Sequence, residues 1–240
     1  WMAYLKANYP GYFMAVLMDS ALGSQTATRT YIRECLSLGI GILPPKINLS
    51  GKYFRIENAS LRFPFLGIRN IGSVVADRLD EIQKKGKISS FVDFVSRAQD
   101  INTRVIESLI LVGAFDDFSE TKQTMVENLR QIMMSLNLGQ NLEELGFVYV
   151  RYPEYDSAYL AAKEKELLGF NISYHPLTSI RNKLAARGIS FLSEQEFAVG
   201  EDVVFAGLLR KTKQIKTRNG DDMAFLEFED MFQSTEATGL

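Results

Sequence analysis

Cysteine and histidine are nearly absent from this 240-residue sequence, which contains only Cys35 and His175. A disulfide within the chain and a zinc site built from cysteines and histidines both need more of these residues, so both are excluded. A single thiol is typical of a cytoplasmic protein. We expect Cys35 to be buried on the inner face of a helix, and His175 to be a turn or capping group before Pro176.

Neither sign of charge dominates, because 27 Lys and Arg stand against 29 Asp and Glu, for a formal net charge of -2. This balance excludes a polybasic tail that coats nucleic acid or an anionic membrane by charge alone, but it allows a local basic face. No apolar run approaches the roughly 20 residues of a bilayer-spanning helix, so no membrane partner is expected. A helical pattern is already under way at residue 1, which indicates a piece of a longer protein.

Hydrophobic periodicity predicts a mainly α fold: a helical body up to about residue 195, followed by β-like segments after Gly200. Helices are expected over residues 1–22 with a break at Tyr9-Pro10-Gly11, over 28–38, from a Ser119 cap to about 135, over 156–168 and over 177–187, with several short helices between 65 and 118. Residues 41–45 are expected to be extended, because the paired prolines exclude a helix. Strand-like segments are expected at 53–56 and 61–63, and an irregular stretch at 137–155. The runs 203–207 and 224–228, with a turn signal at 218–221, predict the first strands of a truncated β domain.

Residues 67–79 carry a helix–hairpin–helix pattern: a short turn, a glycine, three residues, an alanine and an apolar residue. Asn70 and Gly72 both tolerate positive φ, so the turn can be tight. Gly72 lacks a side chain and the next helix opens with free N–H groups, so a DNA phosphate can approach the backbone. An ordinary helical turn is the alternative. The candidate DNA-binding residues here are Arg69, Asn70, Ile71, Gly72 and Ser73.

A second, weaker hairpin follows about 30 residues later. Ser90 can cap a helix over residues 91–98, and the turn that follows contains Asn102, Thr103 and Arg104. This turn lacks the glycine, so packing alone is an alternative to DNA contact. Residues 46–104 hold 11 basic and 6 acidic residues, whereas residues 131–175 hold 3 basic and 6 acidic ones. The positive charge therefore lies with the hairpins.

Several stretches match one protein family in the right order. They are AYLKANYP (3–10), YIREC (31–35), GILPPKIN (41–48), GIRNIG (67–72), ESLI (107–110) with GAFD (113–116), and EKELLGF (164–170) with HPL (175–177). With them, the whole sequence resembles the alpha subunit of bacterial DNA polymerase III, the family C replicative polymerases. It departs from the family pattern at Lys46, where Asp is frequent, and at Thr103, where Lys is frequent.

The resemblance implies four regions. Residues 1–60 would be the end of the fingers, 61–118 a tandem helix–hairpin–helix domain that holds duplex primer-template DNA, 119–200 a helical connector, and 201–240 the start of an OB fold. An OB fold would bind the single-stranded template through basic and aromatic side chains. A solvated hairpin is the alternative for its basic run. The candidate residues are Lys211, Lys213, Lys216 and Arg218.

The resemblance also implies nucleotidyl transfer by the full-length protein, a DNA-directed DNA polymerase that uses magnesium ions held by palm aspartates. Those aspartates should lie upstream, since Asp116-Asp117 and Asp221-Asp222 are adjacent pairs whose side chains diverge. We therefore predict no catalytic residue, metal or cofactor in this segment, and no polymerase or nuclease activity of the segment alone.

The family further implies partners at the bacterial replication fork, namely the sliding clamp and other replicase subunits. A clamp-binding peptide needs a Gln to fix it and apolar side chains to fill a pocket. The candidate residues are Gln140, Leu142, Leu145 and Phe147, and an irregular linker with a buried Leu145 is the alternative.

Two other functions are compatible with the hairpin pattern. The chain could be a non-catalytic helix–hairpin–helix module of a repair or recombination protein, although this leaves the match at 164–177 unexplained. It could also be a protein-interaction scaffold, which predicts no salt-dependent DNA binding.

Overall fold

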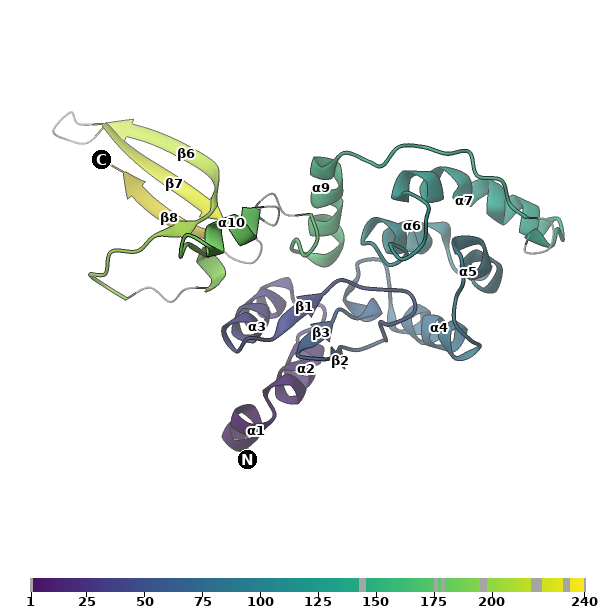
Figure 1. Cartoon of the computed structure of the whole chain (residues 1–240), viewed down its shortest axis with the longest axis horizontal. Helices are drawn as coiled ribbons and strands as arrows, with labels where there is room; N and C mark the ends of the chain where they lie inside the picture. Colours follow the sequence, from purple (N-terminus) through teal and green to yellow (C-terminus); the bar gives the residue numbers. More distant parts are fainter. Residues whose placement is uncertain are drawn as a thin grey trace.

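The computed structural model describes residues 2–142, 146–174, 177, 180–194, 198–216, 222–230 and 234–239. The helices from the first 170 residues form one body, and a three-stranded sheet lies at the opposite end of the molecule from α5 and α7 (Figure 1). The expected mainly α fold with a few strands is confirmed.

The chain begins with three helices whose ends follow from capping chemistry. Pro10 stands in the first turn of the second helix, where its missing N–H leaves no bond unmade. The Ser24 hydroxyl accepts a hydrogen bond from the Ala27 N–H at the start of the third helix, and Gly39 beyond its end takes φ +75°. These helices are α1 (Met2–Asn8), α2 (Pro10–Ser20) and α3 (Gln25–Ser37).

A small sheet follows, made of β1 (Gly41–Leu43), β2 (Arg55–Glu57) and β3 (Ser60–Arg62). The central strand β3 pairs parallel with β1 and antiparallel with β2. The strands expected at 53–56 and 61–63 are displaced, because the turn between β2 and β3 is made by Asn58 at φ +55°.

The hairpin body packs around phenylalanine side chains. The Phe115 ring meets the rings of Phe91 and Phe94 at centroid distances of 5.2 and 4.9 Å, and all three side chains are fully buried. The surrounding elements are the 3-10 turn η1 (Phe65–Gly67) and the helices α4 (Ser73–Lys84), α5 (Phe91–Arg97), α6 (Thr103–Leu111) and α7 (Lys122–Asn137).

The cap of α7 differs from the sequence prediction. Thr121, not Ser119, is the capping residue, and its hydroxyl accepts from the Thr124 N–H at 3.1 Å. The Ser119 hydroxyl instead bonds the Glu120 carboxylate. Either residue type can cap a helix, so the residue types alone do not decide between Ser119 and Thr121.

An extended strap, residues 146–155, lies along α7 and is held by polar side chains of that helix. The Asn128 amide donates to Val150 O at 2.8 Å and accepts from Val150 N at 3.0 Å. The Thr124 hydroxyl accepts from Tyr152 N at 2.9 Å. The helix thus supplies the backbone hydrogen bonds that a neighbouring strand would supply, so the segment needs no hydrophobic period of its own.

The helix α9 (Ser157–Leu168) agrees with its prediction, with Asp156 as N-cap and Gly169 at φ +92° after its end. The helix expected over 177–187 is α-helical in the described residues only at α10 (Arg181–Ala185). The remaining elements are β4 (Ser190–Phe191), η3 (Leu192–Glu194), β5 (Phe205–Ala206), β6 (Leu208–Lys216), β7 (Asp222–Glu229) and β8 (Ser234–Gly239).

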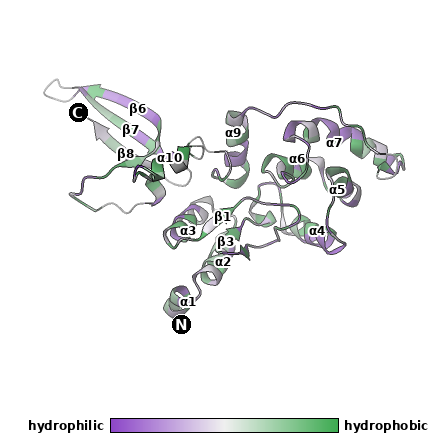
Figure 2. Ribbon diagram, viewed as in Figure 1, coloured by the Kyte–Doolittle hydropathy of each residue, from purple (hydrophilic) through white to green (hydrophobic). Residues whose placement is uncertain are grey.

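The strands β6, β7 and β8 form an antiparallel meander, and β4 pairs parallel with β5. The strand β6 is hydrophilic along most of its length (Figure 2). The turn predicted at 218–221 lies outside the described residues, but the pairing of Lys216 with Asp222 on either side of it agrees with a hairpin.

Candidate nucleic-acid interface

The first hairpin turn presents open backbone at the start of α4. Asn70 takes φ +72°, as the sequence predicts, but Gly72 has φ -88° and ψ 173°, an extended conformation that any residue adopts. The prediction that this position needs a glycine because of a positive φ is therefore wrong for Gly72. A Cβ at Gly72 would meet no atom within 4 Å, so its missing side chain leaves space in front of the first N–H groups of α4.

The turn is fixed by the packing of its apolar side chains and by a backbone hydrogen bond to α9. Ile68, Ile71 and Ala76 are buried. The Arg69 N–H donates to Leu167 O of α9 at 2.8 Å, while the Arg69 side chain stays exposed. Ser73 is exposed as well, so the polar groups of this turn face solvent above a buried base.

The second hairpin joins α5 to α6. The Ser90 hydroxyl caps α5 by accepting from Asp93 N at 3.1 Å, as expected. The Asn102 side chain caps α6 by accepting from Arg104 N at 2.8 Å, which leaves Asn102, Thr103 and Arg104 exposed. Asn102 therefore has a structural role as the N-cap of α6, in addition to its predicted contact with DNA.

Two side-chain contacts join the hairpins. The Asn70 amide donates to the Ser108 hydroxyl of α6 at 3.0 Å. Arg78 of α4 donates to both carboxylate oxygens of Asp100 in the second turn, from Nε at 2.7 Å and from Nη2 at 3.1 Å. No local sequence pattern signals the roles of Arg78, Asp100 and Ser108, because their contacts join residues 22 to 38 positions apart.

The exposed arginines of the two hairpins share one electrostatic neighbourhood. The Lys163 ammonium, 2.9 Å from Glu166 of α9, holds the pKa of that carboxyl below its usual range, and Arg69 and Arg104 lower it further. All three cations thus act electrostatically on the exposed Glu166 carboxylate, which only Lys163 contacts directly.

Other basic residues between 46 and 104 form ion pairs with acidic residues of this chain. Lys52 lies 2.8 Å from Asp77, and Lys46 pairs with Asp117. Lys46, which stands where the family frequently has Asp, is therefore neutralised by Asp117 and adds no free positive charge near the hairpins.

The candidate residues of β6 divide between the two faces of the sheet. The register pairs Lys211 with Glu227 and Lys213 with Phe225, so these lysines and the exposed Phe225 share one face. Lys216 is on the other face, 3.7 Å from Asp222. Arg218 lies outside the described residues.

The candidate clamp peptide is only partly exposed. Gln140 faces solvent, but Leu142 is 6% exposed, and Phe147 packs edge-on against the Tyr149 ring at 5.0 Å. Leu145 lies outside the described residues. The arrangement keeps Leu142 in the core and does not present it to a partner.

Acidic residues do not form a metal centre in the described part of the chain, where no group of three or more His, Cys, Asp or Glu is placed to hold an ion. Asp116 binds Lys122 and Asp117 binds Lys46, so this adjacent pair diverges as expected. His175 and Asp221 lie outside the described residues. Among the described helices, none has both the length and the apolar character to cross a membrane.

Comparison with known proteins gives one consistent result. A helix-hairpin-helix motif family matches residues 39–125. The DNA polymerase III subunit alpha of Borreliella burgdorferi is 35% identical over 250 residues, covering 95% of this chain and 22% of the relative. Those of Bacillus subtilis and Staphylococcus epidermidis are 32% and 36% identical, covering 98% and 95% of this chain and again 22% of each relative.

The chain thus spans about a fifth of the length of these relatives. The match includes both hairpins and the region after them, which a repair or recombination module would not explain. Over nearly its whole length the chain is similar to one segment of DNA polymerase III subunit alpha, which confirms the resemblance found in its sequence.

Proposed function

We propose that this chain is the duplex-binding segment of a replicative DNA polymerase alpha subunit. Its tandem hairpins, within residues 61–118, would hold the backbone of primer-template DNA behind the active site and so support processivity. The observation that carries the proposal is the open backbone at Gly72, at the start of α4 and beside the exposed Arg69.

The chemistry of this surface suits phosphate and not bases. Free N–H groups at a helix start and a helix dipole favour an anion. Contacts of this kind position a protein on DNA and read no sequence. The Arg78–Asp100 ion pair and the Asn70–Ser108 hydrogen bond fix one hairpin against the other. The two hairpins would therefore bind two phosphates at a set spacing.

The polymerase activity itself would belong to the full-length protein, with magnesium ions held by aspartates upstream of residues 1–60, the end of the fingers. Coverage of only 22% of each relative supports this division. We expect no metal-dependent primer extension by the chain alone.

Two further partners belong to the proposal. Lys211, Lys213 and Phe225 on one face of the sheet would bind single-stranded template as part of an OB fold over residues 201–240. The connector, residues 119–200, would contact the sliding clamp near Gln140, with Leu142 and Phe147 released from the core. The protein would act in the cytoplasm with other replicase subunits.

The test is binding of a blunt DNA duplex to this chain across a salt series. Gly72→Asp places a carboxylate in open space at a φ that any residue adopts, so it should leave the fold intact and abolish binding. Arg69→Ala should weaken binding, and Arg130→Ala, which removes an exposed arginine of α7, serves as the matched control. Equal binding by Gly72→Asp would refute the hairpin as a phosphate site.

A further inference from the structure

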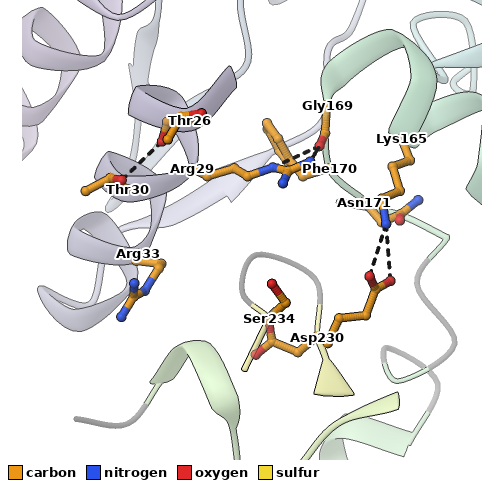
Figure 3. Close-up of a pocket in the computed structure, with 11 residues that line it drawn as sticks. Thr26, Arg29, Thr30, Arg33, Lys165, Gly169, Phe170, Asn171, Asp230 and Ser234 are labelled. Atoms are coloured by element: carbon orange, nitrogen blue, oxygen red, sulfur yellow. Dashed lines mark hydrogen bonds and ion pairs between the residues drawn. The ribbon is translucent and has the colours of Figure 1, made fainter. Parts of the chain in front are cut away.

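A cavity of about 250 Å³ lies where α3, the end of α9 and the strands β7 and β8 meet (Figure 3). Arg29 and Arg33, one turn apart on α3, form one wall, and Lys165 of α9 forms another. Glu229, the last residue of β7, and Asp230 after it are the acidic residues of the lining.

Most of the charges in this cavity are already engaged. Arg29 donates from Nε to Gly169 O at 3.1 Å, which ties α3 to the end of α9. Glu229 is bound by Arg210 and by Lys165, whose ammonium lies 3.2 Å from each carboxylate oxygen. Burial raises the pKa of Glu229, but the bonds from these two cations outweigh burial and hold the pKa below its usual value. Glu229 is therefore ionised and doubly compensated.

Arg33 differs from its neighbours. It is exposed, and no described residue accepts a hydrogen bond from its guanidinium or forms an ion pair with it. It lies across the cavity from Ser234 and Asp230 (Figure 3). Among the described residues, the cations Arg29, Arg33, Lys165 and Arg210 stand against the carboxylates of Glu229 and Asp230, a net charge of +2.

We propose that this cavity binds one phosphodiester group of single-stranded DNA, with Arg33 as the primary contact and Lys165 as the second cation. A guanidinium offers paired N–H donors that match two phosphate oxygens. The volume is below the roughly 300 Å³ at which small-molecule pockets begin, so it suits one group of a longer ligand.

The position of the cavity favours a strand over a free phosphate. The end of α9 that lines it is bonded to the first hairpin through Arg69 N and Leu167 O at 2.8 Å. The strand β7 that lines it also carries Phe225, on the face proposed to bind single strands. The cavity thus connects the two proposed nucleic-acid surfaces, and the inference rests on that proposed function.

The test uses this chain with a labelled oligothymidylate of about 12 nucleotides and, in parallel, a blunt duplex. Arg33→Ala should weaken oligothymidylate binding about tenfold and make the slope of log K against log salt shallower by about 0.7, the loss of one phosphate contact. Arg33→Lys should restore part of the affinity, and Arg130→Ala should change neither quantity. Duplex binding by Arg33→Ala should equal that of the unaltered chain.

Three other results would contradict the proposal. If Arg33→Ala equals Arg130→Ala in affinity and salt slope, the phosphodiester site is refuted, while duplex binding that still depends on Gly72 preserves the proposed function. If thymidine monophosphate binds at Arg33 as tightly as the oligonucleotide does, the cavity takes a free phosphate monoester and the strand assignment is wrong. If the unaltered chain binds neither DNA, the proposed function fails with it.

Discussion

Arg78 of α4 and Asp100 of the second hairpin form a two-point ion pair, with Nε–Oδ2 and Nη2–Oδ1 distances of 2.7 and 3.1 Å. Arg78 also donates to Arg97 O at the end of α5 at 3.0 Å. One side chain therefore links the helix that follows the first turn to the turn of the second hairpin. A DNA backbone that meets both turns meets a preorganised surface, and less binding energy is lost to ordering it.

Asp100→Asn should lower the free energy of unfolding by about 0.5–1 kcal/mol at neutral pH, since the pair is exposed and well aligned. The Arg78 hydrogen bond holds the pKa of Asp100 below its usual value, so this stability is present above the usual pKa and is lost as pH falls through the lowered one. Urea unfolding at neutral and acidic pH should show the difference between the two proteins vanish in acid. Glu81→Gln, a carboxylate 3.5 Å from the same arginine, should have a smaller effect, and a difference that persists in acid would contradict the account.

Glu166→Gln should raise the affinity for duplex DNA about two- to fivefold at low salt, because it removes a negative charge that pairs with Lys163 and acts electrostatically on Arg69 and Arg104. The gain should shrink as salt screens the exposed charges. Fluorescence anisotropy across a salt series measures it. Glu201→Gln, which removes an exposed carboxylate before the sheet, should leave the affinity unchanged. An unchanged affinity for Glu166→Gln would remove α9 from the DNA surface.

Elements that depend on local chemistry were predictable from the sequence. The Ser90 cap, the left-handed Gly169 and the positive φ of Asn70 each follow from one residue and its immediate neighbours. The strap along α7 was not predictable, because its backbone is satisfied by Asn128 and Thr124, which lie more than 20 residues away. Lys213 and Lys216 lie on opposite faces, as the alternation of side chains along a strand already dictates. The pairing of Lys213 with Phe225 needed the strand register, which shifts between Leu209 and Lys211.

Glu164→Ala should lower the free energy of unfolding by about 3 kcal/mol, because it removes a buried carboxylate that accepts hydrogen bonds from three backbone N–H groups. The fully buried Glu164 carboxylate accepts from the N–H groups of Ile172, Ser173 and Tyr174 at 3.0, 3.0 and 3.2 Å. It thereby fixes the turn that follows α9. Chemical denaturation measures the loss, and Glu166→Ala, on the exposed face of the same helix, should cost only a few tenths of a kcal/mol. Equal losses of stability in the two variants would contradict the proposal that Glu164 fixes this turn.

Cys35 should resist thiol reagents at pH 8 until the protein unfolds. The side chain is fully buried, its Sγ lies 3.5 Å from Met18 Sδ, and burial raises the pKa of the thiol to about 12. Both access and the thiolate form are therefore lacking. Ser37→Cys, in a Cys35→Ala background, places a thiol on the exposed end of α3 and should react at once. Prompt reaction of Cys35 in the folded protein would show that α3 opens.

Leu142→Ala should lower the free energy of unfolding by about 2–5 kcal/mol, since its side chain is packed in the core. Gln140→Ala, two residues earlier and exposed, should leave stability unchanged.

The difference in stability between these two variants decides how a clamp would be bound. If the clamp takes Leu142 into its own pocket, the peptide must first leave this core, so Leu142→Ala would weaken clamp binding and destabilise the free chain together. Calorimetry of both variants, with and without the sliding clamp, measures the two effects. A stability unchanged by Leu142→Ala would mean that the peptide is already free to bind.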